Sequence, residues 1–383
     1  MTTSVKYLHS ELSGAPVLSG TAGSLLDVLD ACLVNGWGLL TATSVSVADG
    51  VATAAFATSH AFEPDTIMQV AGATPAGLNG QQRATSTTSN GVSWAAPGVA
   101  DGVATGTITI KLAPAGWTKV AGANKTAYKS GNPSASACWA RIDDTAGRFA
   151  RLRAYESMTD VDTGVGPTPT EVQQVGGLYI SKSDAASSAP RRWIVVASDK
   201  FVVLLVAHLN SYSNNFGLFC WGDFPSLKAG DAYNFLVSAE TTDRLGYTSV
   251  GLGSPMGSWG GSEGVFIVRS YAQVGGCISG YTLKPGLQDT WSGGAANPLG
   301  PNPVNNSLDI IPTILIEGAT SFGNRRGIVP AIYAIPHRLG ELYDSKQPIS
   351  AIIGLPGHVL IGVRFGGAAG NYRFAVDITG PWE

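Results

Sequence analysis

The side chains best suited to chemistry are carboxylates grouped around one stretch of the chain. Asp143 and Asp144 are adjacent, and Glu156, Asp160 and Asp162 follow shortly after them. Two carboxyl groups can act as general acid and base on a glycosidic bond, and carboxylate oxygens also suit Ca²⁺. Adjacent aspartates are equally typical of solvated turns. We favour the turn and predict neither a catalytic nor a metal site, with glycan cleavage and calcium binding as the alternatives.

Histidine and cysteine lack the spacing that metal or nucleophile sites need. The five histidines are His9, His60, His208, His337 and His358, and the four cysteines are Cys32, Cys138, Cys220 and Cys277. No His-Glu-x-x-His or Cys-x-x-Cys motif occurs. The cysteines stand among small or apolar residues, which predicts buried free thiols and fits synthesis in a reducing cytoplasm. Gly-x-Ser-x-Gly and the phosphate-binding loop are missing as well, so we expect no enzyme and no cofactor.

The composition points towards a protein that works against neighbours. Charged residues make up 13% of the 383 residues, about half the usual share. Such a chain has few groups for solvating an isolated surface, although a β-protein with many glycine turns explains the same numbers. The net charge is −3, and the pairs Arg191-Arg192 and Arg325-Arg326 are too short for a basic tract, so we expect no nucleic-acid binding. The apolar segment 25–34 is too short to span a bilayer, and the start lacks a signal peptide's pattern, so we expect no membrane insertion.

The pattern predicts a mainly β fold with one N-terminal helix. Apolar residues from Leu25 to Val34 indicate the helix, with Thr21 or Ser24 as its cap and Asn35-Gly36 at its end. From 43 to 112, short alternating runs separated by turns indicate a small β-barrel or sandwich of about six strands. Within it, Asp49-Gly50-Val51-Ala52-Thr53 recurs at 101–105. Tryptophan and glycine flank this segment on both sides, so we interpret it as a module inserted into a larger domain.

We therefore predict four regions: a central β-rich domain of residues 1–42 and 113–242, the inserted β module 43–112, a Gly-, Ser- and Pro-rich connection 243–307, and a C-terminal β domain 308–383. In the central domain, residues 192–198 and 201–208 predict a hairpin in the middle of a sheet. In the C-terminal domain, Pro312 suggests an edge strand. Trp259 and Trp291 stand in the flexible connection, where they either contact neighbouring proteins or cap the domain's own core.

Several segments resemble bacteriophage proteins. The module resembles a small β module of phage tail and other virion proteins in five segments: Gly50-Val51-Ala52-Thr53, Ser59-His60-Ala61-Phe62, Val70-Ala71-Gly72-Ala73, Leu78-Asn79-Gly80 and Gly106-Thr107-Ile108-Thr109. Ala61 and Pro64-Asp65 depart from the Gly and Gly-Asp of that pattern, which affects the turn. The chain's opening, 6–10, 14–16 and 35–38, and its closing segments, 326–333 and 373–382, are similar to phage virion and tail proteins.

This resemblance implies a non-enzymatic structural component of a bacteriophage particle, made in the host's cytoplasm and placed in the tail or baseplate. Its partners would be copies of itself, in rings of three or six, and other virion proteins. A capsid decoration protein is the first alternative. A tail module that binds a receptor on the host cell surface or degrades glycans is the second. In the family the small module is an accessory domain without a catalytic role.

Overall fold

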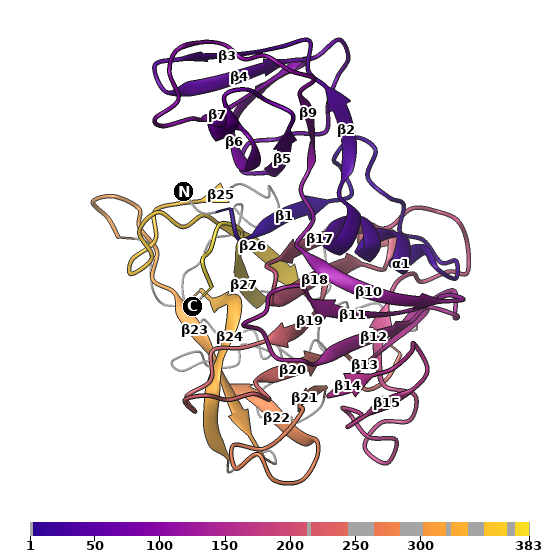
Figure 1. Ribbon diagram of the computed structural model, residues 1–383. Coiled ribbons are helices and arrows are strands. Elements are labelled where there is room, and N and C mark those ends of the chain that lie inside the picture. The colour runs from indigo at the N-terminus through magenta and orange to yellow at the C-terminus, as the bar shows by residue number, and fades with distance from the viewer. Residues whose placement is uncertain are drawn as a thin grey trace.

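The computed structural model describes residues 3–212, 216–243, 264–283, 302–318, 323–335, 348–365 and 372–382. It confirms the mainly β class: 46% of the chain is strand, and curled antiparallel sheets form half-barrels. Figure 1 shows a small β module standing at one end of a larger β body.

The body is built on one antiparallel sheet of twelve strands. In spatial order they are β1 (Lys6–His9), β17 (Arg192–Ala197), β18 (Phe201–Ala207), β19 (Gly217–Asp223), β20 (Phe235–Ser238), β21 (Val265–Ile267), β22 (Ile278–Leu283), β23 (Ile311–Glu317), β24 (Asn324–Ala334), β27 (Tyr372–Asp377), β26 (Leu360–Phe365) and β25 (Pro348–Ile349). A short 3₁₀ turn, η3 (Asn210–Tyr212), follows β18. Strands on both sides of residues 242 and 307 thus pair within a single sheet.

The predicted hairpin around Asp199-Lys200 is confirmed as β17 and β18, which lie between β1 and β19. Its strands are apolar throughout because both faces are covered. Val195 and Leu204 belong to the core on one face, whereas Val196 and Val203 share the other core with C-terminal residues such as Ile332. The sheet therefore curls until its C-terminal strands cover its own N-terminal strands.

The prediction that Pro312 marks an edge strand is wrong. β23 pairs with β22 on one side and β24 on the other. The β22 ladder reaches only from Ile314 to Glu317, so Pro312 lies beyond its end and faces Tyr333 of β24 alone. A proline without an N–H fits this position because no donor is required of it there.

A five-stranded antiparallel sheet covers one face of the large sheet. Its strands, in order, are β10 (Trp117–Gly122), β11 (Lys125–Ser130), β12 (Trp139–Asp143), β13 (Phe149–Tyr155) and β16 (Leu178–Ser181), with the small hairpin β14 (Ser157–Met158) and β15 (Gly164–Val165) beside them. Tyr128, Ile142 and Leu152 are fully buried in the same core as Val195. Tyr179 pairs with Glu240, so the edge strand β16 joins the segment that follows β20.

The predicted helix is present as α1 (Ser24–Leu29), continued by one π-helical turn, η1 (Asp30–Asn35). The predicted cap is wrong. Gly23 precedes the helix, and Ser24 Oγ donates to the carbonyl oxygens of Ser19 and Thr21. The first free helical N–H, that of Leu25, instead donates to Asp144 Oδ2 at 2.9 Å. The turn between β12 and β13 therefore supplies the cap.

The small module has a sheet of its own. Its eight strands, in order, are β2 (Trp37–Thr41), β9 (Thr109–Leu112), β5 (Ile67–Ala71), β6 (Gly80–Thr88), β7 (Gly91–Ala95), β4 (Val51–Ala55), β3 (Ser44–Ala48) and β8 (Gly102–Val103), with a 3₁₀ turn, η2 (Ala76–Leu78). The described strands thus outnumber the six expected. The two Asp-Gly-Val-Ala-Thr copies flank β3, because Ser46 faces Thr53 on one side and Val103 on the other.

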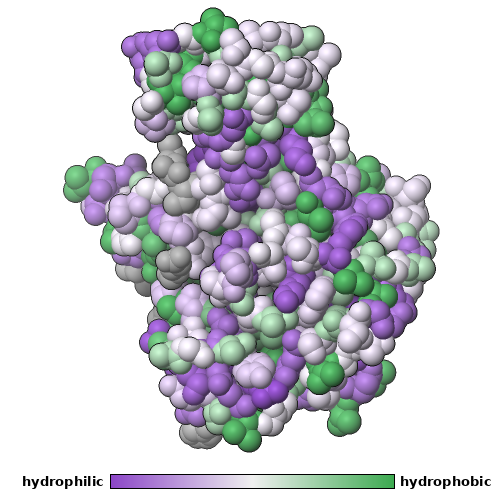
Figure 2. Space-filling model, in the orientation of Figure 1, coloured by the Kyte–Doolittle hydropathy of each residue, from purple (hydrophilic) through white to green (hydrophobic). Residues whose placement is uncertain are grey.

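Polar contacts join the module to the body. Lys6 Nζ of β1 donates to Gln81 Oε1 at 2.8 Å, and His9 Nε2 lies 3.2 Å from Glu63 Oε2. Arg83 Nη2 reaches the carbonyl oxygen of Thr379 at 3.4 Å. Figure 2 shows hydrophilic residues gathered at this junction. The module therefore contacts the body through these polar groups and also through apolar packing, as where the ring of Trp37 lies against Trp193.

Candidate binding surface

The carboxylates singled out from the sequence are each engaged by neighbouring groups. Asp143 Oδ1 accepts hydrogen bonds from the N–H and hydroxyl of Thr145, and Asp143 Oδ2 lies 3.2 Å from Arg141 Nη2. This is the predicted turn geometry. Asp144, next to it, is fully buried and points to α1 and to Lys182. The two aspartates therefore do not share one ligand.

Asp160 and Asp162 are held in their ionised form. Asp160 Oδ1 accepts the backbone N–H of Asp162 at 2.8 Å, and this hydrogen bond, with others from Thr163, lowers the pKa of Asp160. Lys125 and Arg141 donate to Asp162 Oδ1 at 3.0 and 2.8 Å, and they lower its pKa. A carboxyl group with a lowered pKa is a poor general acid at neutral pH. Within the described ranges, no group of three or more His, Cys, Asp or Glu side chains is placed to hold a metal ion.

The histidines that can be placed have structural partners. His60 Nδ1 accepts the N–H of Phe62, and its Nε2 lies 3.0 Å from the carbonyl oxygen of Gly91. Its ring packs against Phe56 and Phe62. His358 Nδ1 lies 2.7 Å from Asp377 Oδ2, where it helps to hold the C-terminal segment. His337 lies outside the described residues.

The cysteines are free thiols, and Cys32, Cys138 and Cys220 are buried. Burial raises the pKa of Cys138 and Cys220 to about 12 and that of Cys277 to about 11. Thiols with such pKa values hold little thiolate at neutral pH and are weak nucleophiles. Trp259 and Trp291, the predicted contact residues, lie outside the described residues, so their role stays a prediction.

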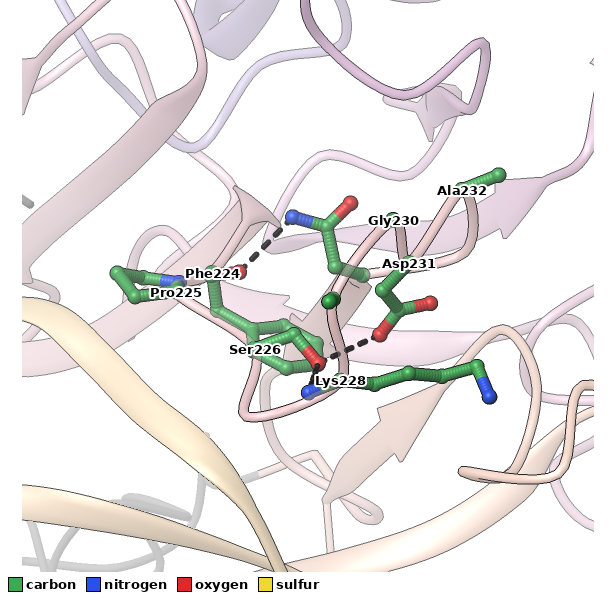
Figure 3. Close-up of a pocket in the computed structure, with 9 residues that line it drawn as sticks. Phe224, Pro225, Ser226, Lys228, Gly230, Asp231 and Ala232 are labelled. Atoms are coloured by element: carbon green, nitrogen blue, oxygen red, sulfur yellow. Dashed lines mark hydrogen bonds between the residues drawn. The ribbon is translucent and has the colours of Figure 1, made fainter.

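A hollow of about 510 Å³ opens at the loop from Phe224 to Asn234, which joins β19 to β20 (Figure 3). The loop is closed at its base, where Asn234 Nδ2 donates to the carbonyl oxygen of Phe224 at 2.9 Å. Across it, Ser226 Oγ donates to Asp231 Oδ2 at 2.7 Å. Lys228 extends along the rim, with its Nζ 5.0 Å from the ring centre of Tyr271.

Asp231 organises this loop. Its carboxylate accepts hydrogen bonds from the N–H of Tyr233 at 3.1 Å and from Gln273 Nε2 at 2.9 Å. Arg326 Nη2 of β24 lies 2.6 Å from Asp231 Oδ2, and both side chains are almost completely buried. Breaking such a buried pair by removing one partner costs about 3–5 kcal/mol. The carboxylate therefore shapes the hollow and is not free to act on a substrate.

A second hollow, of about 470 Å³, shares Phe224, Pro225 and Asn234 with the first. The turn Asp199-Lys200 and the terminal residues Ser4 and Trp382 line it. Asp199 Oδ2 accepts a hydrogen bond from Asn132 Nδ2 at 2.8 Å. Asp223, also in its wall, accepts from the N–H and hydroxyl of Ser136, while burial raises its pKa. Both hollows thus combine hydrogen-bonded polar groups with apolar walls such as Phe224 and Pro225.

Part of this surface could be predicted from local sequence. Pro225 and Gly230-Asp231 are turn residues directly after an apolar strand, so a loop could have been expected there. The contact of Asp231 with Arg326 could not, because the two residues are far apart in the chain and no local pattern connects them.

Comparison of the chain with models of known protein families finds no match, and comparison with curated proteins finds no significant match. Among the described residues, no helix has both the length and the apolar character required to cross a membrane. The fold and the surface thus define the chain as a mainly β protein with a small β module at one end and two hollows on its body.

Proposed function

We propose that this chain is a structural component of a bacteriophage particle, of the tail or baseplate type, that works through contacts with copies of itself and with other particle proteins. The resemblance of the module and of both ends of the chain to virion proteins supports the assignment. The low content of charged residues, 13%, supports a protein whose surface is covered by neighbours.

The observation that carries the proposal is a loop that holds apolar side chains out in solvent. Val172 and Val175 lie between β15 and β16 and are 98% and 76% exposed. The loop has a defined shape, because Arg153 Nη1 lies 2.5 Å from Glu171 Oε1 and Glu171 Oε2 accepts the N–H of Gly176 at 2.9 Å. Covering such valines on association is favourable by about 25 cal/mol for each Å² of apolar surface.

The module offers a second place for contacts. Its sheet ends at β2 and β8, and the apolar residues Leu39 and Val103 on these edge strands are exposed. An edge strand has unpaired backbone groups that can take up a strand from another chain. We therefore assign contacts between copies to the loop between β15 and β16, and contacts with a second particle protein to the module.

Light scattering after size exclusion tests the first contact. The purified chain is expected to form trimers or hexamers, and the double substitution Val172→Ser, Val175→Ser to move it towards monomers. Val17→Ser is the matched control, because Val17 is also exposed but lies outside this loop. A chain that stays monomeric at high concentration, with or without the substitutions, would contradict contacts between copies through this loop.

Antibody labelling of phage particles prepared from the source culture tests the place in the particle. Labelling at the tail or baseplate supports the proposal. Labelling of the head would replace it with the capsid decoration alternative, and particles without label would overturn the virion assignment.

A further inference from the structure

The body holds a lysine and an aspartate in direct contact and out of reach of water. Asp144 directly follows β12, and Lys182 directly follows β16. Lys182 Nζ donates to Asp144 Oδ1, and both side chains are 0% exposed. Transferring two charges into such a site is costly, so burial works against the charged form of this pair.

The surroundings point in the same direction. Burial is the largest cause that lowers the pKa of Lys182, and it raises the pKa of Asp144 to about 6. Each shift favours the uncharged group. Lys182 Nζ also donates to the carbonyl oxygen of Thr21 at 2.8 Å, which fixes the nitrogen against the carboxyl group.

The second oxygen of the carboxyl group faces backbone donors. Asp144 Oδ2 accepts the N–H of Leu25 at 2.9 Å, and the N–H of Leu26 is a further hydrogen-bond donor to this carboxylate. Backbone N–H groups in this position stabilise the negative charge that an oxygen gains when a nucleophile adds to its carbon. A nucleophile, an electrophilic carbon and oxyanion donors are therefore brought together.

We propose that Lys182 and Asp144 condense after folding to form an intramolecular amide bond. The ammonium first gives a proton to Oδ1 of the carboxylate. The amine nitrogen then adds to Cγ of Asp144, while the charge that develops on Oδ2 is held by the N–H of Leu25. The bond from Cγ to Oδ1 breaks, and Oδ1 leaves as water with the acid proton and one amine proton. One amide and one water form, and nothing is oxidised or reduced.

Preorganisation makes the condensation feasible. Amide formation from separate groups in water is unfavourable, but correctly oriented neighbouring groups reach effective molarities of roughly 10⁵–10⁸ M. Exclusion of water from the site also protects the product from hydrolysis. The bond would connect the two strands that flank β13, because β12 and β16 are its neighbours in the sheet. The proposed bond does not depend on whether the chain belongs to a bacteriophage particle.

Peptide mapping by mass spectrometry tests the bond in the full-length wild-type chain. Trypsin cleaves after Arg141, Arg148, Arg153, Lys182 and Arg191. With the bond, cleavage after Lys182 is blocked, and peptide 154–191 appears joined to peptide 142–148 with the loss of one water. Free peptides 142–148 and 154–182 from folded protein would overturn the proposal and leave a buried ion pair.

Substitutions separate the bond from other cross-links. Asp144→Ala removes the carbon that the amine attacks and should give no joined peptide. Lys182→Met removes the nucleophile and should give no joined peptide. Asp143→Asn is the matched control: its side chain faces Thr145 and Arg141, so the joined peptide should persist. A joined peptide that survives in Lys182→Met would also overturn the assignment.

Discussion

Arg269 holds the carboxylate of Glu156 with two nitrogens: Nε lies 2.7 Å from Oε1, and Nη2 lies 2.6 Å from Oε2. Glu156 directly follows β13 of the five-stranded sheet, and Arg269 follows β21 of the twelve-stranded sheet. The guanidinium carbon of Arg269 also lies 4.0 Å from the ring centre of Tyr233. This ion pair therefore fastens one sheet of the body to the other.

Glu156→Gln is expected to lower the free energy of unfolding by about 1–2 kcal/mol. The reason is that a bidentate ion pair with limited exposure stabilises the folded state more than an ordinary surface ion pair does. Arg269→Ala should cost a similar amount, and the double variant less than the sum of the two. Urea denaturation measures all three. Glu11→Gln is the control, since the pair of Glu11 with Arg192 lies at the surface with the Glu11 side chain half exposed. A cost for Glu156→Gln no greater than that of the control would contradict a fastening role.

Lys6 should make stability rise with pH. Burial lowers its pKa from 10.5 to about 8, so between these values the unfolded chain binds more protons than the folded one. Stability therefore increases as pH rises from about 8 to 10.5, by up to roughly 3 kcal/mol. The measurement is the difference in unfolding free energy between wild type and Lys6→Met, taken at pH 7 and at pH 10. The contributions of the other titrating groups cancel in this difference.

Gln81→Leu is the matched variant for Lys6. It removes the hydrogen bond from Lys6 Nζ to Gln81 Oε1 but keeps the titrating amine, so the rise with pH should persist. A wild type whose stability relative to Lys6→Met does not change over this range would show that the amine is hydrated in the folded protein.

The module should fold by itself. Its strands pair only with one another among the described residues, and Trp37 faces Leu112, so its two ends are adjacent. A fragment of residues 36–113 is expected to give dispersed amide signals in NMR and a cooperative thermal transition. Trp94→Ala in the fragment removes a fully buried side chain, at a cost of about 3–5 kcal/mol, and should leave it unfolded. A fragment without dispersed signals would contradict an independent module.

Gly36 should tolerate alanine far less well than Gly50 does. Both have positive φ, 66° and 72°. A Cβ on Gly36 would lie 2.1 Å from the carbonyl oxygen of Leu112, whereas one on Gly50 would meet nothing within 4 Å. We expect a loss of about 1 kcal/mol for Gly50→Ala from backbone strain alone and about 3 kcal/mol or more for Gly36→Ala. Thermal denaturation of the two variants compares them, and equal losses would contradict the steric argument.

Local patterns were sufficient for part of the fold. Alternating and continuous apolar runs predicted the mainly β class and the central hairpin around Asp199, because side chains alternate along a strand and a strand covered on both faces is apolar throughout. The apolar period after Ser24 located the helix. The cysteines are far from one another in the chain and stand among apolar or small residues, which predicted the buried thiols of Cys32, Cys138 and Cys220. Each of these features depends on residues that are close in the chain.

Other features depended on partners distant in the chain. The cap of α1 was predicted at Thr21 or Ser24 but comes from Asp144. Pro312 was predicted at a sheet edge but lies in a strand paired on both sides, past the end of β22.

By itself, the sequence determined which segments become strands, where the helix forms and which thiols are buried, since these follow from periodicity and local polarity. Only the tertiary structure decided which carboxylate meets which cation: Asp144 with Lys182, Asp231 with Arg326, and Glu156 with Arg269. The reason is physical. An ion pair forms between groups that the sheet order and its curl bring within a few ångströms, and no spacing along the chain records that order.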